Sequence, residues 1–245
     1  MDLFKHYRKL AHFSLLLLRG DLTGDNVRLM REYYAQVVLG EVRDLLSIDN
    51  KRVLDVGGAD GTFCKVFHNE LGGEAINLDF HATCANLRWR DSVRGSAHKL
   101  PFNDNMFDLV LCRGVLEHIP LERQQIAINE MRRVTGKGGI CYIAFPPWYN
   151  PFAGHALRPF HILPFKLAKR LTLFFFSKAP LDLSAQSYAD CFLFPITVRR
   201  MLRMLRKSGL HVVAVKDHHF RLHQLAKIPF VRELTVPTVA FIAQA

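Results

Sequence analysis

The sequence predicts an α/β fold: a three-layer, doubly wound sheet of seven mostly parallel strands with helices on both faces. Short apolar runs that predict buried strands alternate with longer stretches of helical periodicity, as in a chain of βα units. The first of these runs ends in a glycine-rich turn, which is typical of parallel sheets that bind a ligand. The 245 residues suffice for one such domain and are too few for two large cores.

The N-terminal region, residues 1–50, is expected to form a helical cap. Residues 2–18 repeat apolar side chains at helical spacing, with Leu3, Tyr7 and Leu10 on one side. A turn-rich break follows, and residues 27–46 predict a longer helix directly before the first strand.

The chain is organised around residues 51–62, where a short strand runs into a turn. Val53–Val56 predict a buried strand, and a helical pattern begins at Phe63. The turn between them holds three glycines, Gly57, Gly58 and Gly61. Glycines let the backbone approach a ligand closely, and the start of the helix offers unpaired N–H groups. We therefore expect a ligand cradle at this turn.

Carboxylates around the turn indicate which ligand it binds. Asp55 and Asp60 would repel a pyrophosphate, but they suit a ligand that carries a sulfonium and an ammonium group. The small residues fall at 57, 59 and 61, which is one residue too tight for a dinucleotide fingerprint. Asp79 ends the next predicted strand, residues 75–80, about 20 residues beyond the first glycine, where an acid meets ribose hydroxyls.

These residues resemble the class I S-adenosylmethionine-dependent methyltransferases, in particular the methyltransferase type 11 domain. The family motif D-x-G-x-G-x-G matches residues 55–61, with Ala59 at the second glycine, a replacement that suits a negative φ there. Further family motifs follow in order: L-P-F at 100–102, F-D-x-V at 107–110, E-H at 117–118 and G-G at 138–139. The resemblance covers residues 28–146 and implies one antiparallel strand near the end of the sheet.

The resemblance implies that the protein binds S-adenosylmethionine and releases S-adenosylhomocysteine. The positions that match cofactor-binding residues of the family are Asp55, Gly57, Gly58, Ala59, Gly61, Asp79, Phe80, Ser96, Ala97, His98 and Arg113. In the family an acid accepts a hydrogen bond from adenine where this chain has Ser96, so we expect the hydroxyl to accept it instead. The helix over 27–46 is expected to close over the cofactor, with Tyr33 and Tyr34 either touching it or packing in the core.

Methyl transfer to an alcohol needs a base near the acceptor oxygen, and histidine suits this task. The candidate catalytic residues are Glu117 and His118, after the fourth strand, and His155, in the segment expected to fold over it. Packing or hydrogen bonding within the loop is the alternative role for His118. The histidines lack zinc-site spacing, so no metal site is predicted. An ion between His118, His155 and an acid is compatible with the sequence, but no motif supports it.

Residues 51–146 make up the expected cofactor-binding core, and residues 147–194 leave the family pattern as an insertion rich in proline and aromatic residues. We expect this insertion to cap the carboxyl ends of the strands, where the acceptor binds. Within it, residues 163–178 predict a basic amphipathic helix that ends in three phenylalanines. That pattern fits a helix at a membrane interface, and packing in the core is the alternative.

Residues 195–245 are expected to complete the sheet, with an amphipathic helix over 195–207 and strands over 210–215 and 238–242. The formal net charge is +11, and residues 147–245 carry fourteen basic and four acidic side chains, a balance of +10. This excess indicates an anionic partner for the C-terminal part: a membrane surface, a phosphorylated substrate or, less favoured, nucleic acid.

We expect methyl transfer to oxygen or carbon of a small-molecule, lipid-linked or glycan-linked acceptor. An RNA methyltransferase that uses the basic C-terminal part and a catalytically idle subunit with this fold are the alternatives. The five scattered cysteines lack metal-type pairing and favour reduced thiols in the cytoplasm. No apolar run reaches the length of a membrane span, and no signal-peptide cleavage site is apparent, so any membrane contact is expected to be peripheral.

Overall fold

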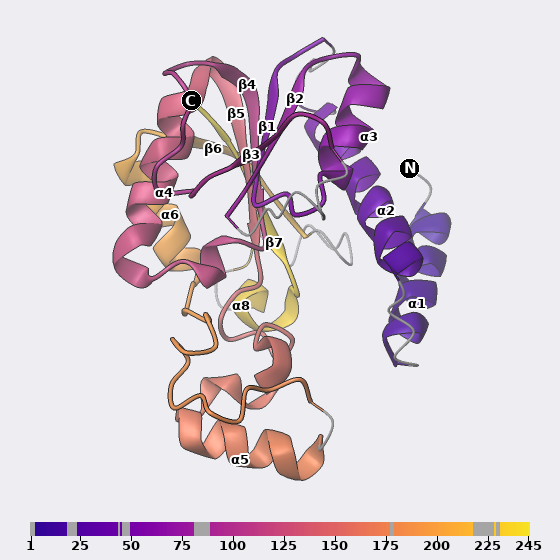
Figure 1. Ribbon diagram of the computed structural model, residues 1–245, viewed down its shortest axis with the longest axis vertical. Helices are drawn as coiled ribbons and strands as arrows, with labels where there is room; N and C mark the ends of the chain where they lie inside the picture. The colour runs from indigo at the N-terminus through magenta and orange to yellow at the C-terminus, as the bar shows by residue number, and fades with distance from the viewer. Residues whose placement is uncertain are drawn as a thin grey trace.

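The computed structural model is built around a seven-stranded sheet with the strand order β3-β2-β1-β4-β5-β7-β6 (Figure 1). Strand β7 runs antiparallel to both of its neighbours, and the other pairs are parallel. This confirms the predicted α/β sheet with one antiparallel strand. The structure describes residues 3–18, 24–43, 45, 50–80, 89–176, 179–217, 228 and 231–245.

The strands are β1 (Val53–Val56), β2 (Ala75–Asp79), β3 (Ser92–Arg94), β4 (Phe107–Arg113), β5 (Thr135–Phe145), β6 (His211–Asp217) and β7 (Val239–Gln244). The α-helices are α1 (Leu3–Leu18), α2 (Gly24–Arg43), α3 (Thr62–Leu71), α4 (Leu121–Val134), α5 (Phe165–Phe175), α6 (Val198–Lys207) and α8 (Val231–Thr235). Short 3₁₀ helices form at η1 (Leu116–His118), η2 (His155–Leu157) and η3 (Phe160–Ile162).

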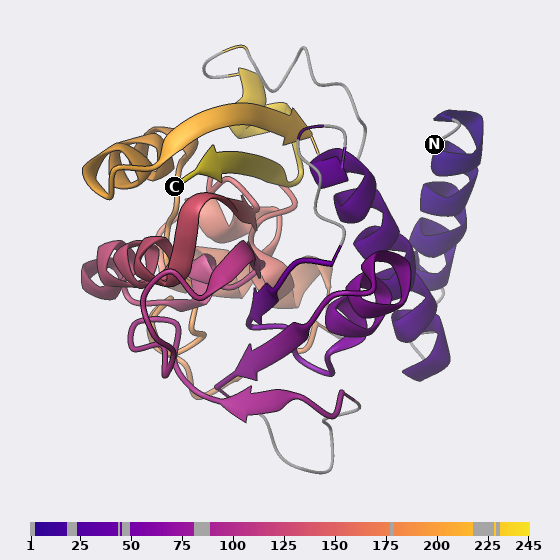
Figure 2. The same cartoon turned by 90° about the horizontal axis from the view of Figure 1, so that it is seen from above.

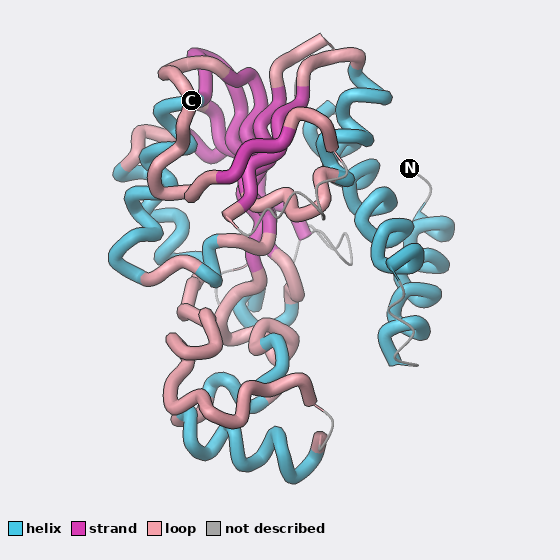
Figure 3. Tube along the Cα trace, viewed as in Figure 1, coloured by secondary structure: helices cyan, strands magenta, loops and turns pink. Residues whose placement is uncertain are grey.

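The two faces of the sheet are buried under different helices. Side chains alternate along β4, so Leu109 and Leu111 pack with α2 and α3, whereas Val110 and Cys112 pack with α4 and α6. Figures 2 and 3 show the sheet between these two helical layers. Because both faces are covered, the central strands are apolar throughout, which is why short apolar runs marked them in the sequence.

Several element boundaries differ from the sequence-based expectation. Strand β5 begins at Thr135, before the G-G motif at 138–139, because Thr135 pairs with Phe107 before the register shifts around the glycines. Helix α6 begins at Val198, where the Thr197 side chain caps it by accepting from the Arg200 N–H.

The N-terminal helices also differ in detail. Helix α2 spans Gly24–Arg43 rather than residues 27–46. The side of α1 that faces the protein carries His6 and Phe13, which are buried, whereas Tyr7, predicted on the apolar side, is exposed. His6 Nδ1 hydrogen-bonds the Tyr33 hydroxyl at 2.5 Å, so a polar side chain helps join α1 to α2. The apolar spacing of this short segment could not reveal that pairing.

The insertion follows β5 and projects beyond the carboxyl ends of the parallel strands, with α5 at its far end (Figure 1). Helix α5 buries Ala168 and Thr172, whereas its phenylalanines at 174 and 175 are exposed. The helical spacing of this segment places Leu167, Leu171, Phe174 and Phe175 on one face, and three of these four side chains are turned to the surface. Among the described residues, no helix combines the length and apolar character needed to cross a bilayer.

Candidate active site

The turn after β1 is shaped so that only glycine fits at three of its positions, and Gly61, with φ +76° and its Cβ position against Trp89, is one of them. Gly57 has φ +76°, and a Cβ there would overlap the side chain of Val115. A Cβ on Gly58 would overlap oxygens of Asp55 and Asn77. Ala59 has φ +50°, so the negative φ expected for it is wrong, and alanine sits in a conformation that favours glycine.

Strand β2 fixes the shape of this turn through two side chains. Asp79 Oδ2 accepts from the Ala59 N–H at 3.0 Å, and Asn77 Nδ2 donates to the Ala59 carbonyl at 3.1 Å. Both backbone groups of Ala59 are thereby held, which stabilises its left-handed conformation. Asn77 was not predicted as a site residue. The sequence signal for Asn77 was a polar residue between the apolar Ile76 and Leu78, and the structure buries its side chain fully.

An inner cavity of about 250 Å³ lies between α2 and the ends of β1 and β4. Asp55 and Arg113 line it from the neighbouring strands β1 and β4, and the Arg113 guanidinium lies over Tyr34 at 4.9 Å and over Phe63 at 5.2 Å. Burial raises the pKa of Asp55 to about 7 and lowers the pKa of Arg113. A buried anion and a buried cation in one cavity match the ammonium and carboxylate groups of an amino acid.

Unpartnered polar atoms support a ligand in the inner cavity. Asp55 Oδ2 and Arg113 Nε are buried and have no hydrogen-bond partner among the described residues. Leaving such groups unpaired costs free energy that a zwitterionic ligand would recover. The methionine part of S-adenosylmethionine therefore fits this cavity. Arg31, which we did not predict, also lines it and is held by Asp60 at 2.9 Å.

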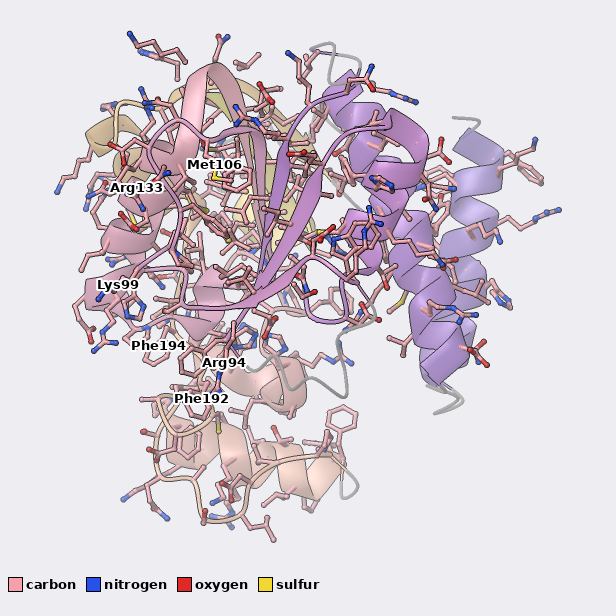
Figure 4. The ribbon with its side chains drawn as sticks, turned by 45° about the horizontal axis from the view of Figure 1, so that its top comes forward. Arg94, Lys99, Met106, Arg133, Phe192 and Phe194 are labelled. Carbon is pink, nitrogen blue, oxygen red and sulfur yellow. The ribbon has the colours of Figure 1, made fainter. Side chains whose placement is uncertain are left out.

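An outer cavity of about 680 Å³ adjoins the first, and Gly57 and Gly114 line both. Asp79 and Phe80 line it on the ribose side, together with the segment Ser96–His98. Phe192 and Phe194 close it where the insertion meets the body of the protein (Figure 4). The adenosine part of the cofactor fits the glycine-loop side of this cavity, which leaves the side toward the insertion for an acceptor.

On the side of the outer cavity expected to hold adenine, a chain of hydrogen bonds joins Arg123, His98 and Ser96. Arg123 donates to His98 Nε2 at 3.3 Å, which leaves His98 Nδ1 to donate to Ser96 Oγ at 2.7 Å. Ser96 keeps a lone pair and its own proton for a ligand. Its role toward adenine stays a prediction.

A distant helix holds this adenine segment in place. Arg133 of α4 donates to the carbonyls of Leu100 and Phe102 at 3.0 and 2.7 Å. Glu130 accepts from the Leu100 N–H at 2.8 Å and is itself bonded to Arg133. The L-P-F motif is therefore anchored through its backbone, and Arg133 (Figure 4) is a positioning residue that motif reading missed.

The three predicted catalytic side chains lie together beside the outer cavity. His118 lines this cavity, and its ring centroid is 4.9 Å from that of His155. Glu117 is buried next to them, and burial raises its pKa to about 7. Burial and the neighbouring His118 lower the pKa of His155 to about 4. The insertion thus brings His155 to the E-H motif, although their catalytic roles stay predictions.

The two tyrosines of α2 have packing roles in this structure. Tyr34 is buried and lies against Arg113, and Tyr33 packs against His6 and Phe13. Tyr34 does not line the inner cavity, but its stacking on Arg113 orients a residue that does. Of the two alternatives left open by the sequence, the packing role agrees with the structure.

Comparison with known proteins gives the same assignment. Residues 54–143 match a family model described as a methyltransferase domain. An uncharacterized methyltransferase of Mycobacteroides abscessus is 28% identical over 233 residues, covering 91% of this chain and 85% of the relative. Another from Mycobacterium leprae is 30% identical over 198 residues, covering 78% of this chain and 71% of the relative.

Solved structures share the fold at low sequence identity. A geranyl diphosphate methyltransferase in complex with SAM gives a TM-score of 0.57 at 14% identity, over 87% of this chain and 84% of that one. An S-adenosylmethionine-dependent methyltransferase from Mesorhizobium loti gives a TM-score of 0.56 at 17% identity, over 85% of this chain and 98% of that one. The methyltransferase relatives, together with the glycine turn and the two adjoining cavities, identify S-adenosylmethionine as the cofactor. The chain belongs to the class I S-adenosylmethionine-dependent methyltransferases.

Proposed function

We propose that this enzyme methylates an oxygen or carbon of a lipid-linked or otherwise hydrophobic small-molecule acceptor. The observation that carries the proposal is the outer cavity, which continues from the cofactor turn to the insertion. Ala189, Phe192 and Phe194 form its wall on the insertion side. Cavities of this size bind molecules of drug-like dimensions, and mostly apolar walls select apolar ones.

The side chains at this end of the cavity suit a hydroxyl group on such an acceptor. The bound cofactor supplies an electrophilic methyl group. His118 Nδ1 donates to the Phe192 carbonyl at 2.8 Å, so its Nε2 keeps a lone pair. That lone pair is available to an acceptor hydroxyl, while the apolar wall excludes water and holds the acceptor in line.

The direct test is transfer of a labelled methyl group to fractionated cell material. Purified protein and methyl-labelled S-adenosylmethionine are incubated separately with lipid, aqueous metabolite and RNA fractions, and mass spectrometry locates the label. We expect label in the lipid or apolar metabolite fraction, lost when Asp79 becomes Ala. Label in RNA alone would favour the RNA alternative. Formation of no S-adenosylhomocysteine with any fraction would favour the idle subunit.

We also propose that α5 docks the enzyme on an anionic membrane surface as a peripheral protein of the cytoplasm. Phe174, Phe175 and Phe176 are 78%, 61% and 51% exposed, an unusual cluster for a surface in contact only with water. Lys166 and Arg170 of the same helix are also exposed. Apolar side chains with neighbouring basic ones are typical of interfacial helices. Docking there would bring the insertion, and the cavity it closes, to a lipid-linked acceptor.

Vesicle co-sedimentation tests this docking. Phe174→Ser with Phe175→Ser should weaken binding to phosphatidylglycerol-containing vesicles by at least tenfold, because two apolar anchors are lost. Lys166→Gln with Arg170→Gln should remove only the electrostatic part of the vesicle-binding free energy, which added salt screens, about 1 kcal/mol per side chain. Phe4→Ser is the matched control, since Phe4 is 74% exposed on α1. Equal sedimentation of the parent and the phenylalanine variant would contradict the proposal.

A further inference from the structure

Two separate parts of the chain bring three potential metal ligands to one point. Glu117 and His118 come from η1, directly after β4, and His155 begins η2 in the insertion. One carboxylate oxygen and one ring nitrogen from each histidine lie within 4.8 Å of one another. We infer that Glu117, His118 and His155 form a binding site for one divalent transition-metal ion, such as Zn²⁺, at the acceptor end of the outer cavity.

The carboxylate supplies an independent sign of a missing partner. Glu117 is 3% exposed, and its Oε2 atom has no hydrogen-bond partner among the residues that the structure describes. A buried carboxylate oxygen without a donor is costly, because water has been removed and nothing replaces it. A cation between Glu117 and the two imidazoles would satisfy this oxygen directly.

The hydrogen bond of His118 prepares the ring for coordination. Its Nδ1 lies 2.8 Å from the Phe192 carbonyl, which can only accept, so Nδ1 carries the proton and Nε2 has the lone pair. Metal-bound histidines commonly donate their second ring nitrogen to a carbonyl in this way, which fixes the tautomer and the ring orientation. The Phe192 side chain therefore lines the cavity, and its carbonyl orients the His118 ring for metal coordination.

The backbone around His155 is built to present its ring to His118. His155 has φ +48°, a conformation that non-glycine residues rarely adopt. The preceding Gly154 is packed so closely against the buried His161 ring that a Cβ would overlap it. His161 in turn is held by the Trp148 carbonyl, 2.6 Å from its Nε2. Such strain persists where the surrounding structure enforces it, and it is concentrated at functional sites.

The donor set indicates the class of ion. Two imidazole nitrogens and one carboxylate oxygen favour Zn²⁺ and neighbouring transition metals over Mg²⁺ or Ca²⁺, which prefer oxygen ligands. Tetrahedral coordination at about 2.1 Å would place the ligand atoms roughly 3.4 Å apart. Because the ligand atoms lie within 4.8 Å of one another, the three side chains need to close by at most about 1.4 Å. Both imidazoles lie at the exposed rim of the cavity, whereas Glu117 is buried, so this closure would come from small shifts at the rim.

Three protein ligands leave coordination positions for another molecule, as in catalytic rather than structural sites. If the enzyme methylates a hydroxyl, as proposed above, an acceptor oxygen could take one of these positions. With the ion bound, His118 Nε2 coordinates the metal and no longer accepts the hydroxyl proton itself, and the ion would instead favour loss of that proton to bulk solvent. The methyl carbon would then leave the cofactor sulfur and bond to that oxygen, releasing S-adenosylhomocysteine. This role rests on the proposed function, whereas the metal site itself does not.

The test measures metal binding by the full-length protein without any acceptor. Protein stripped with a chelator is titrated with Zn²⁺ by calorimetry and with Co²⁺ by visible absorption. We expect one ion per chain. His118→Ala, His155→Ala and Glu117→Gln should each weaken binding by about 100-fold or more, because each removes a direct ligand. His211→Ala, which removes an exposed histidine of β6, is the matched control.

The outcomes separate the metal site from the methyltransferase assignment. S-adenosylhomocysteine binding and thermal unfolding are measured for every variant, and Glu117→Gln preserves side-chain shape in case truncation disturbs folding. One-to-one binding that the three variants lose and His211→Ala keeps would support the site. The metal site would be overturned if the parent protein bound no stoichiometric metal ion, or if His118→Ala and His155→Ala bound the metal as tightly as the parent. Either result would count even where cofactor binding is normal.

Discussion

At the scale of single residues, the left-handed conformation of Ala59 predicts that glycine would be better there. A non-glycine L-residue in the left-handed region costs about 1–2 kcal/mol of stability. Replacing it with glycine removes this cost, but the greater conformational freedom of glycine in the unfolded chain offsets part of the improvement. Ala59→Gly should therefore raise the free energy of unfolding by about 0.5–1 kcal/mol. This corresponds to a rise in melting temperature of about 1–4 °C in thermal unfolding.

A matched variant tests the reasoning about Ala59. Ala127 is fully buried within α4, so Ala127→Gly should lower the free energy of unfolding by about 1 kcal/mol. If Ala59→Gly also lowers the melting temperature, the left-handed strain at the turn is not the dominant effect.

Asp55 makes cofactor binding depend on pH. Its pKa is raised to about 7 by burial, with Arg113 and Arg31 opposing that rise and Asp79 and Asp60 adding to it. Because the folded pKa exceeds the unfolded one, Asp55 favours the folded state below about pH 4. That contribution is lost as the pH rises through 7. A cationic ligand group favours the carboxylate, so binding of S-adenosylmethionine below pH 7 should release a proton.

Calorimetry measures this linkage in two buffers of different ionisation enthalpy. At pH 6 the parent protein should release close to one proton per cofactor bound, and its affinity should fall up to about tenfold per pH unit below 7. Asp55→Asn should abolish both effects. Identical proton release by Asp55→Asn would mean that another group titrates.

At the scale of elements, α4 holds the adenine segment from outside the cavity. Arg133→Met removes hydrogen bonds to the carbonyls of Leu100 and Phe102. We expect the free energy of unfolding to fall by about 2 kcal/mol, since this guanidinium is partly exposed. We also expect weaker S-adenosylhomocysteine binding and faster hydrogen exchange over residues 96–102.

The neighbouring arginine provides the control for this prediction. Arg132 makes one long contact of 3.4 Å, to the Thr135 carbonyl, so Arg132→Met should leave exchange over residues 96–102 unchanged. Equal exchange in the two variants would show that the segment holds its shape without Arg133.

At the scale of the whole molecule, the central sheet and the cofactor turn could be predicted from the sequence. Val53–Val56 and Phe107–Arg113 are buried on both faces, so local apolar runs carry their signal, and glycines mark the turn that needs them. Contacts between distant segments carried no such signal. Arg133 reaches a loop about 30 residues away, and His155 meets His118 only through an insertion of short 3₁₀ helices and turns.

The amphipathic segment in the insertion shows the same limit. Its periodicity correctly predicted a helix, α5, but spacing alone could not say which side faces the protein. The structure turns Phe174 and Phe175 outward and buries the smaller Ala168 and Thr172. Orientation of a helix depends on what packs against it, and that information lies elsewhere in the chain.

The junction of the two cavities at Gly57 and Gly114 has a kinetic consequence. In the proposed placement the donor would span the junction, with its amino-acid end inside and its nucleoside outside, and the acceptor would take the remaining space toward the insertion. An acceptor already seated there would lie across the route by which the donor enters. We therefore expect compulsory-order turnover, in which the donor is first to arrive and S-adenosylhomocysteine is last to depart. Product inhibition by S-adenosylhomocysteine should then be competitive with the donor and noncompetitive with the acceptor.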